Sequence, residues 1–311
     1  MRLVFMGTPD IAASVLKRLY EEGFDVAAVV TNPDKPKGRS GAPVFSPVKE
    51  EAMLHGTKVL QPLKAGDPAF VERLEQLAPD VMVVIAYGHI LRQKVLDIPR
   101  LGCVNIHTSL LPKYRGAAPI NQAIIDGCSE TGVTTMLMDA GMDTGDILLQ
   151  WKVPIEPKET AGSLFEKLAA AGADLIVETL RGMEAGTIEP KKQEGEPSYV
   201  HMMTKNDGLV DWTKSAAKIE RLIRGLDPWP GAFSFLEGKR VKLLAADVLE
   251  EAADADPGTV DGSSKKELVV NTGCGKLRIT RLQQEGKKAM DAPDYLRGVH
   301  LSDNSRFTDG K

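Results

Sequence analysis

The chain has 311 residues, of which 42% are hydrophobic and 26% charged, and such a composition is ordinary for a globular protein with a real core. Its length suggests two domains. The net charge of −4 shows that the chain is not basic overall, in contrast to many proteins that bind nucleic acids. No apolar run approaches the roughly 20 residues of a membrane span, and the first residues lack the apolar stretch of a secretory signal. We therefore expect a cytoplasmic protein that does not bind membranes.

The three cysteines, Cys103, Cys128 and Cys274, lie far apart and lack the paired spacing that structural zinc sites use. We expect them to be reduced, and we predict no metal site.

Short β-branched runs alternate with helical periods in the N-terminal half, and this is the pattern of βαβ units. The predicted strands are 2–6, 26–30, 58–60, 81–86, 103–107, 132–139 and 147–153. The predicted helices are 9–22, 46–55, 67–78, 117–126 and 160–183. The strands lack polar alternation, as expected when helices cover both faces of a sheet. The fold class is therefore α/β, with a Rossmann-like, mostly parallel sheet.

The pattern changes near residues 182–198, which are rich in Gly, Pro, Glu and Lys and poor in apolar residues. Such a composition is typical of a linker. After one helix at 215–225, several brief strand runs follow at close spacing, which favours a small β-barrel of the OB type. We predict a catalytic domain at 1–189, a linker at 190–205 and an OB-like C-terminal domain at 206–311.

Two polar residues stand near the end of the predicted strand 103–107. Ligands of open α/β sheets bind beyond the carboxyl ends of the strands, so Asn105 and His107 are site candidates by position. Because they are two residues apart on one strand, their side chains share a face. A lone histidine at such a place is more often a satisfied core residue.

An acidic turn, GMDTGD at 141–146, follows the predicted strand 132–139. Its glycines permit tight backbone geometry, and its aspartates are also good turn formers, so by itself it indicates only a turn. The turn contains Asp143, and Asp139 comes just before it. Together with a histidine at another strand end, these carboxylates shift the interpretation toward a functional site.

An asparagine, a histidine and an aspartate suit direct acyl transfer to an amine. An asparagine amide and a protonated histidine both donate to a developing oxyanion, and a nearby carboxylate orients the imidazole. No enzyme nucleophile is required, and Ser109 does not lie in a G-x-S-x-G elbow. The first turn, MGTPD, also lacks G-x-G-x-x-G, which argues against a dehydrogenase.

Two basic clusters are candidates for binding phosphate groups. The first is the long loop 31–43, with Lys35, Lys37 and Arg39; a long loop beside the predicted site is more often functional than not. The second lies in the predicted barrel and consists of Lys276, Arg278, Arg281, Lys287 and Lys288. It fits a nucleic-acid-binding face and a lysine-guarded strand edge about equally well.

Seven segments, in the same order, resemble the folate-dependent formyltransferase family, and within it the bacterial methionyl-tRNA formyltransferases. They are MGTPD, PDKPKGR, VVIAYGHIL, NIHTSLLPKYRGAAPI, MDAGMDTGDIL, LVDWTKSA and RGLDPWPGA. The similarity spans nearly the whole chain. The patterns N-x-H, SLLP and D-x-G-D are common to all folate-dependent formyltransferases, whereas the basic loop and the C-terminal domain with DPWP carry the likeness to the tRNA-specific members.

The resemblance implies transfer of a formyl group from 10-formyltetrahydrofolate to the α-amine of methionyl initiator tRNA. It implies that Asn105 and His107 hold the formyl oxygen. It also implies that Asp143 sets the protonation state of His107 and relays the proton of the amine. It places folate against nine residues: Ser109, Leu110, Leu111, Pro112, Ala86, Tyr87, Gly88, Ile90 and Asp139. It assigns tRNA contacts to Lys35, Lys37 and Arg39, and we expect a monomer.

Three alternative reactions use the same N-terminal half. They are formylation of an amino sugar nucleotide, formylation of glycinamide ribonucleotide, and hydrolysis of formyltetrahydrofolate by water. A catalytically silent RNA-binding protein is a further alternative, but such a module has no need of Asn105, His107 and Asp143 together.

Overall fold

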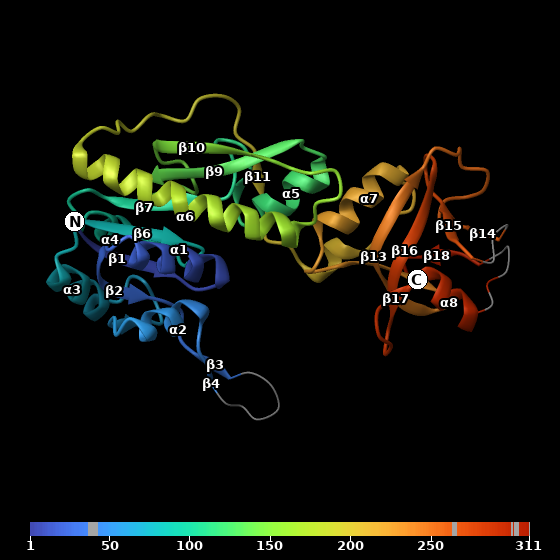
Figure 1. Ribbon diagram of the computed structural model, residues 1–311, viewed down its shortest axis with the longest axis horizontal. Coiled ribbons are helices and arrows are strands. Elements are labelled where there is room, and N and C mark those ends of the chain that lie inside the picture. Colours follow the sequence, from blue (N-terminus) through green and yellow to red (C-terminus); the bar gives the residue numbers. More distant parts are fainter. Residues whose placement is uncertain (37–42, 263–265, 300, 302–304, 311) are drawn as a thin grey trace. The chain divides into compact units, whose positions relative to one another are not determined.

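The chain folds into two compact units (Figure 1). The structure, a computed structural model, describes residues 1–36, 43–262, 266–299, 301 and 305–310. The first unit consists of Met1–Pro119, Glu130–Pro154 and Phe165–Val200, and the second of Ile120–Ser129, Ile155–Leu164 and His201–Lys311. The domain limits at 189 and 205 stay predictions. Within the described residues, no helix is long and apolar enough to span a membrane.

A seven-stranded sheet forms the centre of the first unit. In spatial order its strands are β10 (Ile147–Pro154), β9 (Glu130–Leu137), β7 (Cys103–His107), β6 (Val81–Ile85), β1 (Arg2–Gly7), β2 (Asp25–Val30) and β5 (Val59–Leu60). The strands from β7 to β5 pair in parallel, whereas β9 pairs antiparallel with both β7 and β10. The Rossmann-like, mostly parallel sheet predicted from the sequence is confirmed.

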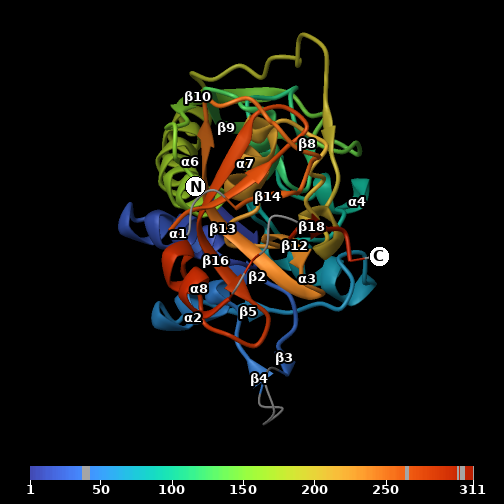
Figure 2. The ribbon, with the colours of Figure 1, turned by 90° about the vertical axis from the view of Figure 1, so that its right-hand side faces the viewer.

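Helices cover both faces of this sheet. They are α1 (Asp10–Glu21), α2 (Pro47–Leu54), α3 (Pro68–Leu77), α4 (Gln93–Leu96) and α6 (Ala161–Ala185). Figure 1 shows α1 and α6 in front of the strands, and Figure 2 shows them on the opposite side of the unit from α3 and α4. On the α3 and α4 side, a buried apolar cluster joins these helices to β1, β2 and β6. Burial on both faces explains why the strands read as continuous apolar runs.

Local sequence signals start these helices. Ser46 accepts a hydrogen bond from the backbone N–H of Lys49 (3.1 Å) and so caps α2, and Asp67 caps α3 through the N–H of Ala69 (3.0 Å). In both helices a proline occupies the first turn, where its missing N–H is no loss. The helix α1 begins after Pro9 and buries an apolar stripe at helical spacing.

Short paired strands connect the loops of the first unit. They are β3 (Lys35–Pro36) with β4 (Pro43–Val44), and β8 (Arg115–Gly116) with β11 (Tyr199–Val200). The β8–β11 pair brings residues of the predicted linker onto the segment that follows β7. Part of that linker therefore packs as a structural element of the first unit.

The second unit contains an antiparallel sheet and several helices. Its strands in spatial order are β14 (Val260–Asp261), β15 (Leu268–Asn271), β16 (Lys276–Gln284), β13 (Lys239–Leu249), β12 (Ala232–Leu236) and β18 (Phe307–Thr308), with β17 (Met290–Asp291) beside β16. The helices are α5 (Pro119–Asp126, of which Pro119 belongs to the first unit), η1 (Lys205–Gly208), α7 (Ala216–Gly225) and α8 (Ala292–Gly298).

The two end strands of this sheet meet. An antiparallel bridge joins Thr259 to Arg306, and the N–H of Val260 donates to the carbonyl of Ser305 at 2.9 Å. The interior is a separate apolar core in which side chains of α7 and the strands pack together, among them Ile219, Ile223 and Leu277. The second unit therefore has an apolar core of its own.

Candidate active site

Two neighbouring strands end at the candidate site. Val84 of β6 lies beside Asn105 of β7 in a parallel pair, so the turn after β6 begins close to the end of β7. On its other side β7 pairs with β9, which leads into the loop 138–146 that carries Asp143. The adjacency of these strands is what brings residues from three distant segments together.

His107 is buried, with 6% of its surface exposed, and both of its ring nitrogens face oxygen atoms. Nε2 lies 2.9 Å from the carbonyl oxygen of Tyr114, and since a carbonyl only accepts, Nε2 carries a proton and donates it. Nδ1 lies 3.7 Å from Oδ2 of Asp143. An imidazolium is thus matched on both sides, while the 3.7 Å gap is too long to commit the Nδ1 proton to Asp143.

Asp143 is held in a left-handed backbone conformation with φ of 53°. The N–H of Gly116 donates to its Oδ2 at 2.7 Å, a charge-assisted bond that aims the carboxylate. Gly116 itself has φ of 108°, and a Cβ there would lie 2.2 Å from the carbonyl oxygen of Val200. Only glycine fits this position, so the RG dipeptide after SLLP is part of the site's geometry.

Asp139 organises the loop that carries Asp143. Its Oδ1 accepts hydrogen bonds from the N–H of Gly141 (2.9 Å) and from Oγ1 of Thr144 (2.6 Å). Gly145 closes the loop against β9, because a Cβ there would meet the carbonyl oxygen of Leu137 at 1.6 Å. The GMDTGD turn is therefore both a tight turn and the carrier of a site carboxylate.

The amide of Asn105 is free to bind a ligand. Asn105 is half-buried, and its side chain makes no hydrogen bond with any residue that the structure describes. A half-buried amide without a protein partner on the same strand as His107 is suited to bind a polar atom of a ligand.

The turn after β6 presents backbone groups and an apolar side chain. Ala86 and Gly88 have left-handed conformations, with φ of 46° and 83°, and Ile90 is 84% exposed. Tyr87 is buried; its hydroxyl finds no partner in the described chain, and burial raises the pKa of that phenol to about 12. Exposed peptide groups beside an exposed apolar side chain fit the edge and face of a flat heteroaromatic ring.

Asn32, at the end of β2, holds this turn in place. Its Nδ2 donates to the carbonyl of Tyr87 (3.2 Å), and its Oδ1 lies 2.6 Å from Nε2 of His89, which therefore donates. Gln61 donates to the backbone carbonyl of Asn32 at 2.9 Å. The ends of β2 and β6 are thus joined by side-chain hydrogen bonds.

The SLLP turn is built from buried groups. The Ser109 hydroxyl is fully buried and donates to the carbonyl of Lys113 at 2.6 Å, while Leu111 is buried and its N–H meets Oγ1 of Thr134 at 3.3 Å. Leu110 packs closely over Gly132, and Pro112 is half-buried. The Ser109 hydroxyl stabilises the turn, so a contact of this turn with a ligand would come from the apolar wall and the backbone.

The predicted basic loop is described only in part. The backbone of Lys35 pairs with Val44, whereas Lys37 and Arg39 lie outside the described residues. At the base of the loop, Asp34 accepts hydrogen bonds from Lys49 and Gln61, and these bonds hold the pKa of its carboxyl below the ordinary value. The loop therefore starts from a fixed anchor beside the Asn32 network.

The second basic cluster divides into paired and unpaired cations. Lys276 is buried with Asp254 (2.8 Å) and Asp261 (2.7 Å), and Arg278 pairs with Asp247 and Glu267. These two side chains are engaged in ion pairs within the unit, and they lie on β16, which pairs with β15 on one side and β13 on the other, so they do not guard a strand edge. Arg281, Lys287 and Lys288 are exposed and form no ion pair with a described carboxylate.

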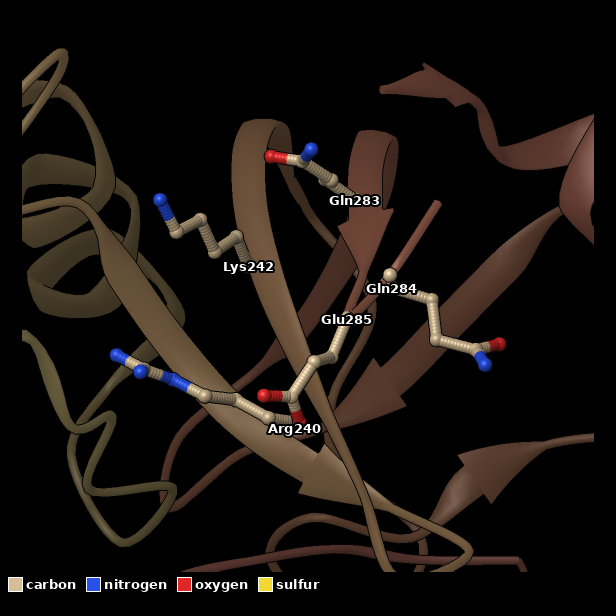
Figure 3. A pocket seen from close by; sticks show the side chains of 6 residues that line it. Arg240, Lys242, Gln283, Gln284 and Glu285 are labelled. Carbon is tan, nitrogen blue, oxygen red and sulfur yellow. The ribbon is translucent and has the colours of Figure 1, made fainter. Parts of the chain in front are cut away.

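A pocket of about 210 Å³ lies on β13 and the end of β16 (Figure 3). It is lined by Arg240, Lys242, Gln283, Gln284, Glu285 and Gly286. Arg240 stacks on Phe233, with its guanidinium 3.8 Å from the ring centroid. The lining thus combines two cations and two amides with the carboxylate of Glu285.

Three residues that touch the predicted site were not predicted from the sequence. They are Gly116, Gln193 and Asn32. The N–H of Gly116 binds the Asp143 carboxylate, and the side chain of Gln193 binds backbone carbonyls of the Asp143 loop. The side chain of Asn32 holds the 86–90 turn. Gly116 lies four residues after the SLLP motif, and a glycine so close to a predicted site is a signal that the sequence offers. Gln193 lies in a segment with the composition of a linker, and no sequence signal marks it.

Comparison with known proteins gives a consistent result for both units. A family model described as formyl transferase matches residues 1–180, and one described as the formyl transferase C-terminal domain matches residues 202–300. A methionyl-tRNA formyltransferase of Lachnospira eligens is 53% identical over 97% of this chain and 98% of its own, and one of Caldanaerobacter subterraneus is 50% identical over 98% and 99%.

A solved structure shares the fold at lower identity. It is an N-formyltransferase of Helicobacter canadensis in complex with folinic acid and dTDP-3-aminofucose, with a TM-score of 0.69 and 21% identity over 91% of this chain and 99% of the other.

Proposed function

Because this chain belongs to the formyl transferase family and has methionyl-tRNA formyltransferases as full-length relatives, we propose that it moves a formyl group from 10-formyltetrahydrofolate to the α-amine of methionyl initiator tRNA. The observation that carries the chemistry is the 3.7 Å approach of His107 Nδ1 to Asp143 Oδ2 beside the free Asn105 amide. Relatives near 50% identity over the full length favour the tRNA acceptor over a sugar nucleotide, for which the likeness is near 20%.

The reaction is direct acyl transfer without an enzyme nucleophile. The α-amine attacks the formyl carbon, a C–N bond forms, and the carbonyl oxygen becomes an oxyanion. The Asn105 amide and the Nδ1–H of His107 donate to this oxyanion, and each such donor is worth about 3 kcal/mol in related sites. When the tetrahedral centre collapses, its bond to N10 of the folate breaks and leaves formylated methionyl-tRNA and tetrahydrofolate.

Asp143 provides charge and a proton path. Its carboxylate lies 3.7 Å from Nδ1 of His107 and so presents a negative charge to the imidazole that donates to the oxyanion. It then accepts the proton that the attacking amine loses, and this proton finally goes to N10 of the departing folate. A carboxylate that already holds one backbone donor from Gly116 is kept in place for this task.

Folate binds between the turn after β6 and the SLLP turn. The flat pterin meets the peptide groups of Ala86, Tyr87 and Gly88, and Ile90 covers a ring face. Leu110, Leu111 and Pro112 form the apolar wall, and Asp139 contributes through the loop that it organises. The fit rests on the exposed residues Ala86, Gly88 and Ile90 and on the half-buried Leu110 and Pro112, whereas Leu111 is buried within its turn.

The acceptor tRNA meets basic side chains from two places in the chain. Lys35, Lys37 and Arg39 contact the acceptor end, while Arg240 and Lys242, at the pocket of Figure 3, contact a backbone phosphate. The C-terminal unit is an OB-like barrel; the bridge between Thr259 and Arg306, which joins its end strands, supports this. A cytoplasmic monomer without membrane association completes the proposal.

A direct test offers four acceptors side by side with 10-formyltetrahydrofolate: charged initiator tRNA, charged elongator methionine tRNA, glycinamide ribonucleotide and an amino sugar nucleotide. We expect rapid formylation of the initiator tRNA and little of the other three. A reaction without acceptor measures hydrolysis of the donor by water. Preferred formylation of a small amine, or donor hydrolysis as fast as transfer, would refute the proposed acceptor.

A further inference from the structure

A segment of the predicted linker, residues 191–200, runs along the edge of the candidate site; we call it the crossing segment. At its start, Lys191 and Ile147 exchange backbone hydrogen bonds of 2.7 and 2.8 Å at the beginning of β10. At its end, the N–H of Arg115 and the N–H of Ala117 donate to the carbonyls of Ser198 (2.8 Å) and Val200 (3.0 Å). The segment therefore spans from the end of the Asp143 loop to the turn that contains Gly116.

Gln193 is the side chain by which the crossing segment holds the Asp143 loop. Its Nε2 donates to two backbone carbonyls of that loop, those of Asp143 and Gly145, both at 2.8 Å. Its Oε1 accepts from Nε and Nη2 of Arg115, at 3.1 and 2.7 Å. All four hydrogen-bonding positions of the amide are thus used.

The chemistry of the neighbours fixes the orientation of this amide. On one side stand two carbonyl oxygens, which only accept, and on the other a guanidinium, which only donates. A flipped amide would oppose like groups on both sides, so only one orientation is stable. Gln193 is therefore a rigid link and not a loosely attached surface side chain.

Arg115 in turn is fixed to the crossing segment a second time. It is buried, with 9% of its surface exposed, its Nη1 donates to the hydroxyl of Tyr199 at 3.0 Å, and its guanidinium carbon lies 5.7 Å from the centroid of the Tyr199 ring. Arg115 directly precedes Gly116, whose N–H binds the Asp143 carboxylate. One network thus holds Asp143 at its carbonyl, through Gln193, and at its carboxylate, through Gly116.

We propose that Gln193 is a positioning residue for formyl transfer, which acts by holding Asp143 at the distance and angle that His107 requires. This inference rests on the proposed function. Asp143 adopts a left-handed conformation, which carries a cost for any residue other than glycine. The two bonds from Gln193 to the carbonyls of Asp143 and Gly145 hold the loop in that conformation in the absence of substrate.

The variants Gln193→Glu and Gln193→Ala both remove the two donors, the first with an added negative charge and the second without one. A glutamate keeps the oxygen that Arg115 binds, and pairs with it as an ion, but it turns an oxygen toward the carbonyls of Asp143 and Gly145. We expect kcat to fall by 10- to 100-fold, with the KM values for folate and tRNA within threefold of wild type, because the loss affects the reacting geometry more than binding. The control is Glu194→Gln, which exchanges a carboxylate for an amide at the neighbouring, exposed position. We expect wild-type kinetics for this variant.

Deuterium exchange of the loop 139–146 without substrate supplies a readout that does not depend on activity. We expect faster exchange at this loop in Gln193→Glu and in Gln193→Ala than in wild type, with unchanged exchange in the strands of the sheet. A variant with wild-type kcat, or a slower variant whose loop exchanges as in wild type, would overturn the positioning role. Global acceleration throughout the first unit would also contradict it, since that marks a general loss of stability.

Failure of the proposed function gives a different pattern. If wild type transfers no formyl group to methionyl-tRNA while the variants still loosen the loop, the acceptor assignment is wrong, but Gln193 remains the residue that holds Asp143. If wild type is active and Gln193→Glu equals it, the positioning inference alone is wrong.

Discussion

Single side chains at this site differ in whether their polar atoms are already bound to protein. The Ser109 hydroxyl, the Asp139 carboxylate and the Gln193 amide are engaged in hydrogen bonds within the protein, and so they shape the site. The Asn105 amide and the Nδ1 side of His107 are available for a ligand. The sequence suggested all of these residues except Gln193, but only their hydrogen-bond partners separate a residue that shapes the site from one that is available to a ligand.

The variant Asn105→Ala tests the availability of the amide. We expect kcat/KM for formyl transfer to fall by about 100- to 1,000-fold, as for loss of one oxyanion donor. The melting temperature should stay near that of wild type, because within the described chain the amide makes no hydrogen bond that folding would lose. Asn206→Ala, which removes an exposed amide from η1, is the matched control and should behave as wild type. A large loss of stability without a loss of rate would show that Asn105 is structural.

The variant Lys276→Met tests the buried cation of the second unit. Hydrogen bonds to Asp254 and Asp261 raise the pKa of Lys276 above its ordinary value of 10.5, so its contribution to stability is complete below pH 10.5 and declines as the pH rises further. We expect the variant to lower the free energy of unfolding at pH 7 by about 2 kcal/mol. Urea unfolding measures this difference, which should shrink above pH 10.5. Lys288→Met, at an exposed position, should have no measurable effect; an equal loss there would contradict the assignment.

At the scale of elements, the strands and helices of the sheet follow from the sequence because buried strands and capped helices have strong local patterns. The strand 103–107 has the same limits in the structure, and the helix predicted at 46–55 is α2 at Pro47–Leu54. The crossing segment could not be predicted in the same way. Its order comes from backbone bonds to Arg115 and Ile147, which are distant in sequence, and its composition favours a flexible linker.

For the site, too, part could be predicted from the sequence and part could not. Asn105, His107 and Asp143 stand out by type and by position relative to strands, and the structure brings His107 and Asp143 to 3.7 Å. The partners that orient them are backbone atoms, such as the N–H of Gly116 and the carbonyl of Tyr114, and these carry no residue-type signal. The roles of all these residues in catalysis stay predictions.

The loop 138–146 offers a test at the element scale. Gly145→Ala would place a Cβ 1.6 Å from the carbonyl oxygen of Leu137, so the loop must move away from β9 and take Asp143 with it. A shift of about 1 Å in a catalytic group lowers rates by about 100-fold, and we expect a loss of kcat of that size. Gly66→Ala is the control, because a Cβ there meets no atom within 4 Å and the residue is outside the site. Normal turnover in Gly145→Ala would mean that this loop tolerates displacement.

At the scale of the whole molecule, charge is organised within an overall acidic chain. A net charge of −4 does not attract tRNA as such, so binding depends on local groups of unpaired cations. In the second unit, Lys276 and Arg278 are neutralised by carboxylates, whereas Arg240 and Lys242 line the pocket of Figure 3. Phosphate contacts are therefore expected at the pocket and at the exposed side chains Arg281, Lys287 and Lys288, and not at Lys276 or Arg278.

Reversal of the two pocket charges tests that expectation. We expect the double variant Arg240→Glu, Lys242→Glu to weaken tRNA binding and to reduce the slope of log Kd against log salt concentration by about 0.9 for each phosphate that the protein no longer neutralises. The affinity for folate should not change. Arg297→Glu, on α8, is the control for charge reversal and should leave the slope as in wild type. An unchanged slope in the double variant would mean that the tRNA phosphates bind elsewhere on the protein.

If Asp143 and His107 act together on the formyl group, as we propose, the variant Asp143→Asn must lower the single-turnover rate of formyl transfer. An asparagine with its Oδ1 toward Gly116 still accepts the hydrogen bond from that N–H but removes the charge that faces His107. We predict a rate at least 100-fold below wild type with an unchanged melting temperature. A rate within threefold of wild type would contradict the account.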